Sequence, residues 1–252
     1  MKAGVFDSGV GGLTVVGSLL ENQLFQEIIY YGDTARVPYG VKDKNTITRY
    51  ALEALEFFKN FDIDILICAC NTVSAYAIEE LKAIAPFPVV GVIEPGVVAL
   101  TNAVKEKDSQ IVILGTKATI RSNKYAALLN QRGYKNLTSL APSLFVPIVE
   151  EGIFEGEVLQ SAMDYYLREI KNPDALILGC THFPLLKKAL QRRFPDTKLI
   201  HSGEAIVEYL EKNFHCTKNN TKTRLKLFAS ENTEGLKKTA LQWLHIKDFT
   251  SC

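Results

Sequence analysis

The sequence predicts an α/β fold made of two similar lobes, each with a mainly parallel central sheet flanked by helices. The first indication is that short apolar runs alternate with longer segments whose apolar residues recur at intervals of three and four, a pattern typical of strands followed by amphipathic helices. The second is that this series occurs twice, with related motifs at the strand ends 110 residues apart. With 252 residues, 47% of them hydrophobic, the chain can bury a core in each lobe.

The first half contains four apolar runs of the length expected for buried parallel strands. The segment SAYAIEELKAI, residues 74–84, lies among them and has helical periodicity. A lobe boundary is expected near IEPG, residues 93–96, because the first series of strands ends there. The four runs are KAGVF, EIIYY, DILIC and PVVGV, at residues 2–6, 27–31, 64–68 and 88–92.

The second half repeats this rhythm and then changes character. PLLKKALQRRF, residues 184–194, is helical in pattern. After the polar linker at 215–223, a strand-like RLKLFAS at 224–230 and a helix-like TEGLKKTALQWLHI at 233–246 could complete either lobe. The four strand-like runs are QIVIL, a weaker NLTSL, DALIL and TKLIH, at residues 110–114, 136–140, 174–178 and 197–201.

Polar motifs at the ends of corresponding strands indicate an internal duplication. Cys70 and Cys180 are 110 residues apart, each at the end of an apolar run and each followed by a polar pair. In open parallel sheets, ligands bind beyond the carboxyl ends of the strands, which is where these motifs lie. The same or nearly the same separation relates Glu94 to Glu204 and DSG at 7–9 to GTK at 115–117.

Charge balance and cysteine content limit the classes of function. The 29 basic and 28 acidic residues give a formal net charge of +1, which provides no electrostatic footprint for nucleic acid or for a membrane surface. A small molecule is therefore the expected partner. No apolar run approaches the roughly 18 residues of a membrane span and no segment has signal-peptide form, so a cytoplasmic protein is predicted. The five cysteines are then expected to be free thiols.

The glycine-rich segment DSGVGG, residues 7–12, resembles a dinucleotide-binding loop only in part. The third glycine of the pattern G-x-G-x-x-G is replaced by Thr14, and no Walker lysine follows, so support for a nucleotide cofactor is small. Two interpretations are equally open. The turn amides and the Ser8 hydroxyl could hold a small ligand, or Asp7 or Ser8 could cap the next helix.

The cysteines are the most informative residues. A thiol between a strand and a helix N-terminus feels the positive end of the helix dipole, which lowers its pKa and makes the thiolate accessible. Cys68, inside the run ILIC, is better explained as core packing. A zinc site would need Cys68, Cys70, Cys180 and His182 in an irregular spacing. A hydrolytic pair of Cys70 and His182 would leave Cys180 without a role.

Two thiols facing each other across a cleft suit the inversion of a stereocentre next to a carboxylate. One group removes a proton from one face of the carbon while the other delivers a proton to the opposite face. The pairs Asn71-Thr72 and Thr181-His182 could hold the carboxylate and so stabilise the developing negative charge. His182 could also orient or tune Cys180.

Six motifs, in a fixed order along the chain, carry a resemblance to a known family. They are DSGVGG, YYGDTARVPYG, ACNTVSA, GVIEPG, LGTKATI and LGCTHFPLL, at residues 7–12, 30–40, 69–75, 91–96, 114–120 and 178–186. Their order and spacing, from the first residues to about residue 207, resemble those of the glutamate racemases. No single motif is specific, but the combination is.

The resemblance implies a cofactor-independent and metal-free enzyme that interconverts L-glutamate and D-glutamate, the latter used for peptidoglycan in the bacterial cytoplasm. It also implies two pseudo-symmetric lobes with the active site in the cleft between them. One lobe is assigned to residues 1–94 plus 208–252 and the other to 95–207. Because the family commonly forms dimers, a homodimer is expected.

The resemblance further implies roles for individual residues. Cys70 and Cys180 become the two acid/base residues, the first acting on the D-enantiomer and the second on the L-enantiomer. Asp7 and His182 are the groups that tune the neighbouring thiols, and Glu150 in VPIVEEG matches a position near the site. The implied substrate-binding pairs are Asp7-Ser8, Tyr39-Gly40, Asn71-Thr72 and Thr181-His182.

Other functions stay open on the sequence. A related enzyme could act on aspartate, hydantoin or maleate, although DSGVGG and VPYG favour glutamate. A non-catalytic amino-acid-binding protein would also have two lobes and a cleft. A zinc-dependent enzyme is a third alternative.

Overall fold

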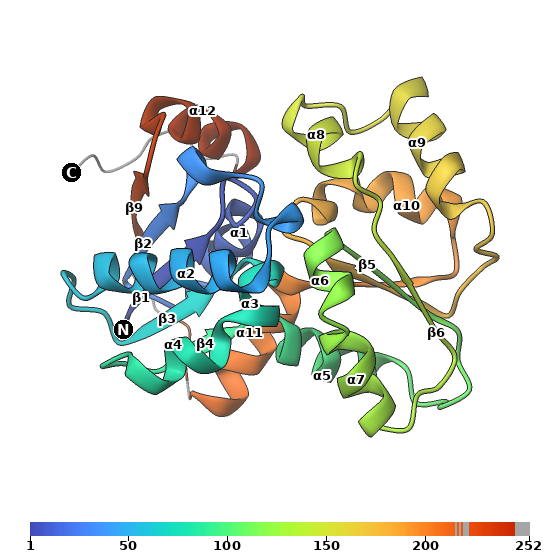
Figure 1. Ribbon diagram of the computed structural model, residues 1–252, viewed down its shortest axis with the longest axis horizontal. Helices are drawn as coiled ribbons and strands as arrows, with labels where there is room; N and C mark the ends of the chain where they lie inside the picture. Colours follow the sequence, from blue (N-terminus) through green and yellow to red (C-terminus); the bar gives the residue numbers. More distant parts are fainter. Residues whose placement is uncertain (215, 217, 219–221, 245–252) are drawn as a thin grey trace.

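The computed structural model describes residues 1–214, 216, 218 and 222–244 and contains two lobes, each built around one sheet (Figure 1). All strand pairs in both sheets are parallel. The larger sheet has the order β4-β3-β1-β2-β9. Its strands in chain order are β1 (Lys2–Asp7), β2 (Glu27–Gly32), β3 (Ile65–Cys68), β4 (Val89–Gly91) and β9 (Arg224–Ala229).

The smaller sheet has the order β6-β5-β7-β8. If β9 is set aside, the larger sheet has the same order when β1 to β4 are matched with β5 to β8. This shared topology supports the duplication inferred from the sequence. The strands are β5 (Ile111–Gly115), β6 (Leu137–Leu140), β7 (Ala175–Gly179) and β8 (Lys198–His201).

Helices cover both faces of the larger sheet, because its central strands are apolar on both sides. One face packs against α1 (Leu13–Glu21), α11 (Ser202–Asn213) and α12 (Thr233–Leu244). The other face packs against α2 (Lys44–Phe58), α3 (Asn71–Tyr76) and α4 (Ile78–Ile84).

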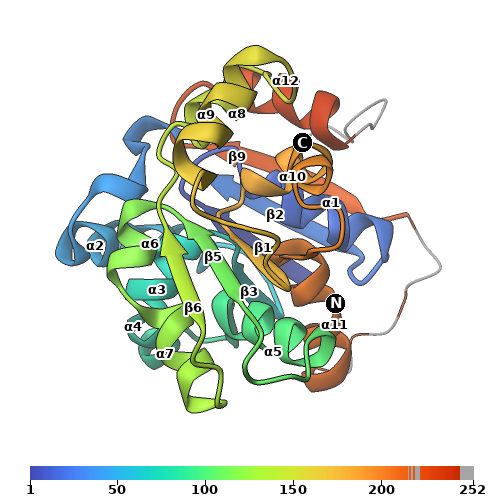
Figure 2. The same ribbon diagram turned by 90° about the vertical axis from the view of Figure 1, so that its right-hand side faces the viewer.

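The smaller sheet is covered in the same way. One face packs against α8 (Phe145–Glu150), α9 (Glu157–Leu167) and α10 (Lys187–Arg193). The other packs against α5 (Ile93–Ala103) and α7 (Lys124–Gln131). Helix α6 (Lys117–Arg121) contacts the short turn Tyr39–Val41 of the other lobe. Helix α11 packs on both α1 and α5 and so joins the lobes (Figure 2).

The sequence located the strands to within one or two residues, but two helices differ from the prediction. The segment 74–84 belongs to two helices, α3 and α4, which meet at Ala77, and α3 begins earlier, at Asn71. The segment 184–194 starts within a 3-10 turn, Phe183–Leu186, which has Pro184 in its first turn, and α10 follows from Lys187.

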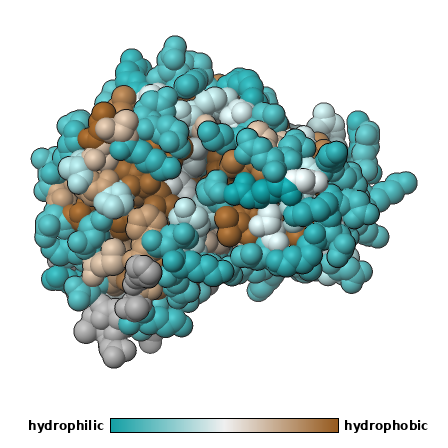
Figure 3. Space-filling model, turned by 90° about the horizontal axis from the view of Figure 1, so that it is seen from below, coloured by the Kyte–Doolittle hydropathy of each residue, from teal (hydrophilic) through white to brown (hydrophobic). Residues whose placement is uncertain are grey.

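The tail contributes an edge strand, since β9 pairs with β2, and α12 packs on α1. Residues 245–252, which include the end of the predicted helix, and linker residues 215, 217 and 219–221 lie outside the described residues. The lobe boundaries at 94/95 and 207/208 stay a prediction. Among the described residues, no helix is long and apolar enough to cross a membrane. Figure 3 shows a mainly hydrophilic surface from below, with hydrophobic groups gathered over the larger sheet's lobe.

Candidate active site

A cavity of about 320 Å³ lies where the carboxyl ends of strands from both sheets meet. Each lobe contributes motifs that directly follow its strands, in agreement with the rule for ligand sites in open sheets. Of the residues predicted for the site, all except Asp7 line this cavity. They are Ser8, Tyr39, Gly40, Cys70, Asn71, Thr72, Glu150, Cys180, Thr181 and His182.

Cys70 lies at the N-cap of α3, as the sequence predicts, and is 5% exposed. Its sulfur is 3.4 Å from Ser8 Oγ. Burial and the nearby charge of Asp7 nevertheless raise the pKa of Cys70 to about 12. The expected lowering by the helix is therefore wrong for this thiol, because the Val73 N–H and the Ser8 hydroxyl offset only part of the cost of burying a thiolate.

Asp7 is the last residue of β1 and is fully buried behind the cavity. The Gly9 N–H donates to its Oδ2 at 3.0 Å, and the Thr181 hydroxyl of the other lobe donates to its Oδ1 at 3.3 Å. Burial raises its pKa despite these donors. The capping alternative is wrong, since Gly12 is the N-cap of α1 and no side chain caps it. Asp7 instead links the strand end, the glycine-rich turn and the second lobe.

The second thiol has a different environment. Cys180 Sγ lies 3.8 Å from His182 Nδ1, and His182 Nε2 lies 3.1 Å from Glu150 Oε1. Burial alone would lower the pKa of His182, but hydrogen bonds to Cys180 and Glu150 raise it to about 10. His182 is therefore protonated near neutral pH and can donate a hydrogen bond to the Cys180 sulfur.

The glycine-rich segment lets Thr181 and His182 of the other lobe pack closely against Gly11. This role was not predicted from the sequence. A Cβ on Gly11 would lie 2.3 Å from Thr181 Oγ1 and 2.6 Å from His182 ring atoms. Thr14, which stands where a nucleotide loop has its third glycine, donates its hydroxyl to the Thr181 carbonyl at 2.8 Å. Both Gly11 and Thr14 thus position the Thr181-His182 pair.

Sequence reasoning missed the hydroxyl cluster contributed by the second lobe. Thr72 Oγ1 is 2.9 Å from Thr116 Oγ1 and 3.3 Å from Thr119 Oγ1, and Thr116 also lines the cavity. A signal was present in the sequence, because GTK at 115–117 corresponds to the binding motif DSG in the other half. Gly40 also packs here, since a Cβ at this position would lie 2.6 Å from Thr116 Cβ.

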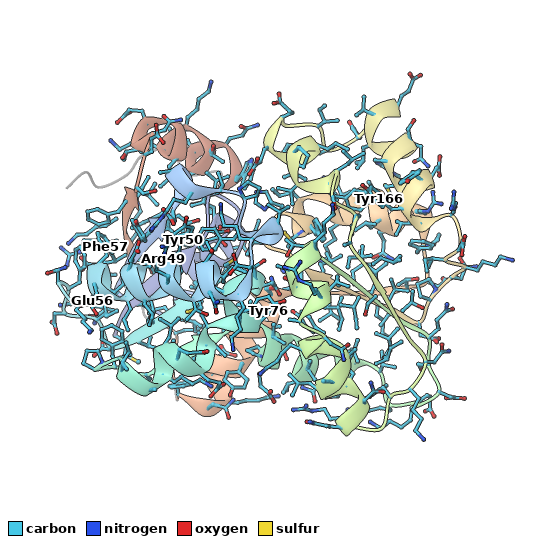
Figure 4. The ribbon with its side chains drawn as sticks, viewed as in Figure 1. Arg49, Tyr50, Glu56, Phe57, Tyr76 and Tyr166 are labelled. Carbon is cyan, nitrogen blue, oxygen red and sulfur yellow. The ribbon has the colours of Figure 1, made fainter. Side chains whose placement is uncertain are left out.

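The loop that carries Tyr39 depends on a buried carboxylate that the sequence also did not single out. Asp33 is fully buried and accepts hydrogen bonds from the Tyr39 hydroxyl and, at 2.6 Å, from Arg36 Nε. The Arg36 guanidinium stacks 4.1 Å from the ring centroid of Tyr50. Figure 4 shows Tyr50 on α2 beside Arg49. This network holds one wall of the cavity.

The cysteines differ in their surroundings. Cys68 is buried in the core of the larger lobe, and burial raises its pKa, in agreement with its predicted packing role. Cys68, Cys70, Cys180 and Cys216 are free thiols. In the part of the chain that the structure describes, no three His, Cys, Asp or Glu side chains are grouped as metal ligands. The zinc alternative therefore finds no ligand set among these residues.

Known proteins resemble this chain in fold and in sequence. A family model described as Asp/Glu/Hydantoin racemase matches residues 19–210. The glutamate racemase of a Nitratiruptor species is 63% identical over 245 residues, covering 97% of this chain and 96% of the relative. The crystal structure of glutamate racemase from Campylobacter jejuni subsp. jejuni has a TM-score of 0.97 at 58% identity, covering 98% of this chain and 100% of that chain.

A more distant relative has been solved with a ligand. The glutamate racemase of Francisella tularensis subsp. tularensis, in complex with D-glutamate, has a TM-score of 0.86 at 31% identity. The alignment covers 99% of this chain and 95% of that one. On these similarities along nearly the whole chain, the protein belongs to the glutamate racemases of the Asp/Glu/Hydantoin racemase family.

Proposed function

We propose that the protein interconverts L-glutamate and D-glutamate by a two-base mechanism without a cofactor. One observation carries this proposal: Cys70 and Cys180 follow the equivalent strands β3 and β7 and line the same cavity from different lobes. A substrate held between them presents opposite faces of its α-carbon to the two sulfurs. The names of the relatives support glutamate as the substrate.

The proposed reaction moves one proton off the substrate and another onto it. The thiolate of Cys180 takes the α-proton of L-glutamate, and the C–H electron pair passes into the carboxylate as a carbanion forms. The thiol of Cys70 then gives its proton to the opposite face, which yields D-glutamate and leaves Cys70 as the thiolate. The reverse reaction starts from Cys70. The raised pKa of Cys70 suits its role as proton donor in the first direction.

The groups beside each thiol suit a carboxylate. The helix N-terminus at Asn71 and Thr72 presents backbone N–H groups together with amide and hydroxyl side chains. Thr181 and the protonated His182 present donors from the opposite wall. Preorganised donors of this kind stabilise the charge that develops when the proton leaves. We assign Ser8, Tyr39 and Gly40 to substrate binding as well.

The function is tested by incubating either glutamate enantiomer with protein that has been freed of metal and pyridoxal phosphate. The circular dichroism signal of both enantiomers is expected to decay to zero, and in deuterated water the α-proton should be replaced by deuterium. A signal that persists would contradict the proposal. Binding measured by calorimetry without α-proton exchange would favour an amino-acid-binding protein, and metal found in the purified protein would favour the zinc alternative.

Replacement of Glu150 by glutamine is expected to change the pH dependence of turnover. Glu150 is one of two partners that raise the pKa of His182 to about 10, so the neutral amide lowers that pKa. Activity that needs the protonated imidazole is lost as the pH rises through this pKa, and the alkaline limb of kcat therefore moves to lower pH.

The Glu150→Gln change also has a matched control and a second measurement. The exposed neighbour Glu151 does not line the cavity, and Glu151→Gln should leave the profile unchanged. Because the folded pKa of His182 is above its ordinary 6.5, the stabilisation from its protonated form is complete below about 6.5 and is lost as the pH rises through about 10. An unshifted His182 titration by NMR in the Glu150 variant would contradict this assignment.

Aspartate is the closest competing substrate, and comparison of turnover on glutamate and aspartate decides between them. We further propose that the D-glutamate serves peptidoglycan synthesis, that the protein is cytoplasmic and that it forms a homodimer, all of which rest on the resemblance to the family. Rescue of a bacterial strain that requires external D-glutamate tests the first point. Light scattering after size-exclusion chromatography tests the oligomeric state.

A further inference from the structure

Asn71, which lines the cavity next to Cys70, is held by two side chains from distant parts of the chain, one on α7 and one on α11. The Tyr125 hydroxyl, on α7, donates to Asn71 Oδ1 at 2.7 Å. Asn71 Nδ2 donates to the Ser202 hydroxyl, at the start of α11, at 3.2 Å. Burial raises the pKa of the Tyr125 phenol, so the hydroxyl keeps the hydrogen that it donates to Asn71.

These two contacts hold both ends of the Asn71 amide. The Tyr125 hydroxyl donates to the amide oxygen, and the amide nitrogen donates to the Ser202 hydroxyl. All three side chains are buried, at 2 to 3% exposure. Together the two hydrogen bonds fix which end of the Asn71 amide carries the oxygen, and they leave one N–H and one lone pair of that amide for a ligand.

The position of the Tyr125 ring is itself tightly defined. It lies against Gly179, where an added Cβ would be 3.1 Å from Tyr125 Cε2, and against Gly96, where one would be 3.3 Å from the Tyr125 hydroxyl. Gly179 directly precedes Cys180. Tyr125 therefore touches the backbone beside one thiol and the side chain beside the other.

We propose that Tyr125 and Ser202 are positioning residues that hold the Asn71 amide in its substrate-facing orientation. The inference rests on the proposed function, because it assigns the amide to substrate binding in that reaction. Without the Tyr125 hydroxyl, the Asn71 oxygen is buried without its donor, and the amide turns or shifts to find another. Neither Tyr125 nor Ser202 lines the cavity, so both act through Asn71.

The test is a double-mutant cycle on racemisation of both enantiomers, with Tyr125→Phe, Ser202→Ala and Asn71→Ala made singly and in pairs. Tyr125→Phe is expected to lower kcat/KM by about tenfold, the loss typical of one positioned hydrogen bond. In the Asn71→Ala background the same change should cost less than about twofold, because its target is absent. Tyr125→Phe and Ser202→Ala together should cost no more than the larger single change.

The matched control is Tyr134→Phe. Tyr134 is another fully buried tyrosine of the same lobe, and its hydroxyl donates to the Val104 carbonyl away from the cavity. It should destabilise the fold without changing kcat/KM at a temperature where the protein stays folded. Losses that multiply in the double variants, or an unchanged rate for Tyr125→Phe, would overturn the inference while leaving the racemase function intact. A wild-type protein without turnover would overturn both.

Discussion

Replacing either Cys70 or Cys180 by alanine is expected to abolish racemisation. In the proposed mechanism each thiol supplies or accepts a proton on one face of the α-carbon, and loss of a general acid or base costs about 10²- to 10⁴-fold in rate. Because inversion needs both faces, each single variant should lose interconversion in both directions. Circular dichroism of each enantiomer measures the loss. Unchanged turnover in either variant would refute the two-base assignment.

Cys68→Ala provides the matched control for these variants. Cys68 lies two residues before Cys70 but packs in the core and does not line the cavity. Its removal should leave kcat/KM unchanged in the folded protein. Proton exchange tests which thiol acts on which enantiomer. The Cys70 variant should still exchange the α-proton of L-glutamate with deuterated water, and the Cys180 variant should still exchange the α-proton of D-glutamate. The opposite pairing would reverse the assignment of the two thiols.

Replacing Gly11 by alanine is expected to reduce turnover by about 10²-fold, the effect of displacing catalytic groups by about an ångström. The added Cβ would lie 2.3 Å from Thr181 Oγ1 and 2.6 Å from the His182 ring, so Thr181, His182 or the whole lobe must move. Asp7 accepts a hydrogen bond from the Thr181 hydroxyl, and this bond is lost when Thr181 moves. Steady-state kinetics with both enantiomers measures the effect.

Gly17→Ala is the control for the change at Gly11. Gly17 lies inside α1, and a Cβ there would meet only Leu244 Cδ2, at an ordinary contact distance of 3.4 Å. Alanine in a helix interior is favoured over glycine by about 0.5–1 kcal/mol, so this variant should keep its activity and unfold at a slightly higher temperature. Equal activity of the two glycine variants would show that close approach at Gly11 is unimportant.

The environments of the two thiols are unequal although their strands are equivalent. Cys70 lies near a carboxyl group, Asp7, whose own pKa is raised by burial. Cys180 lies near an imidazole, His182, whose pKa is raised to about 10 by Cys180 and Glu150. Two acid/base groups whose surroundings differ in charge can start the cycle in opposite protonation states. The duplication thus places the two thiols at equivalent strand ends, and the neighbouring side chains give them different electrostatic environments.

Much of the fold was predictable because it depends on local patterns. Apolar runs such as DILIC and DALIL predicted strands, and the residues that follow them predicted the site, since parallel strands bring their carboxyl ends to one edge. The helix prediction at 74–84 was less accurate, because the apolar periodicity continues through Ala77, where α3 ends and α4 begins. The weaker run NLTSL is also the least buried strand of its sheet.

The residues that the sequence did not reveal are those whose role depends on a distant partner. Asp33 supports Tyr39, Thr116 meets Thr72 from the other lobe, and Tyr125 holds Asn71. The predicted lowering of the Cys70 pKa was also wrong. A helix N-terminus can be predicted from the sequence, but burial of the thiol near Asp7 cannot.

The α/β class, the two equivalent halves, the family resemblance and ten of the residues that line the cavity could be predicted, because each depends on short segments and on their spacing along the chain. Three features became visible in the folded protein: β9 extends the larger sheet, Gly11 leaves room for Thr181 and His182, and Tyr125 and Ser202 hydrogen-bond to Asn71. These features depend on which atoms come within contact distance after folding, and contact between segments far apart in the chain leaves no periodic pattern in either segment.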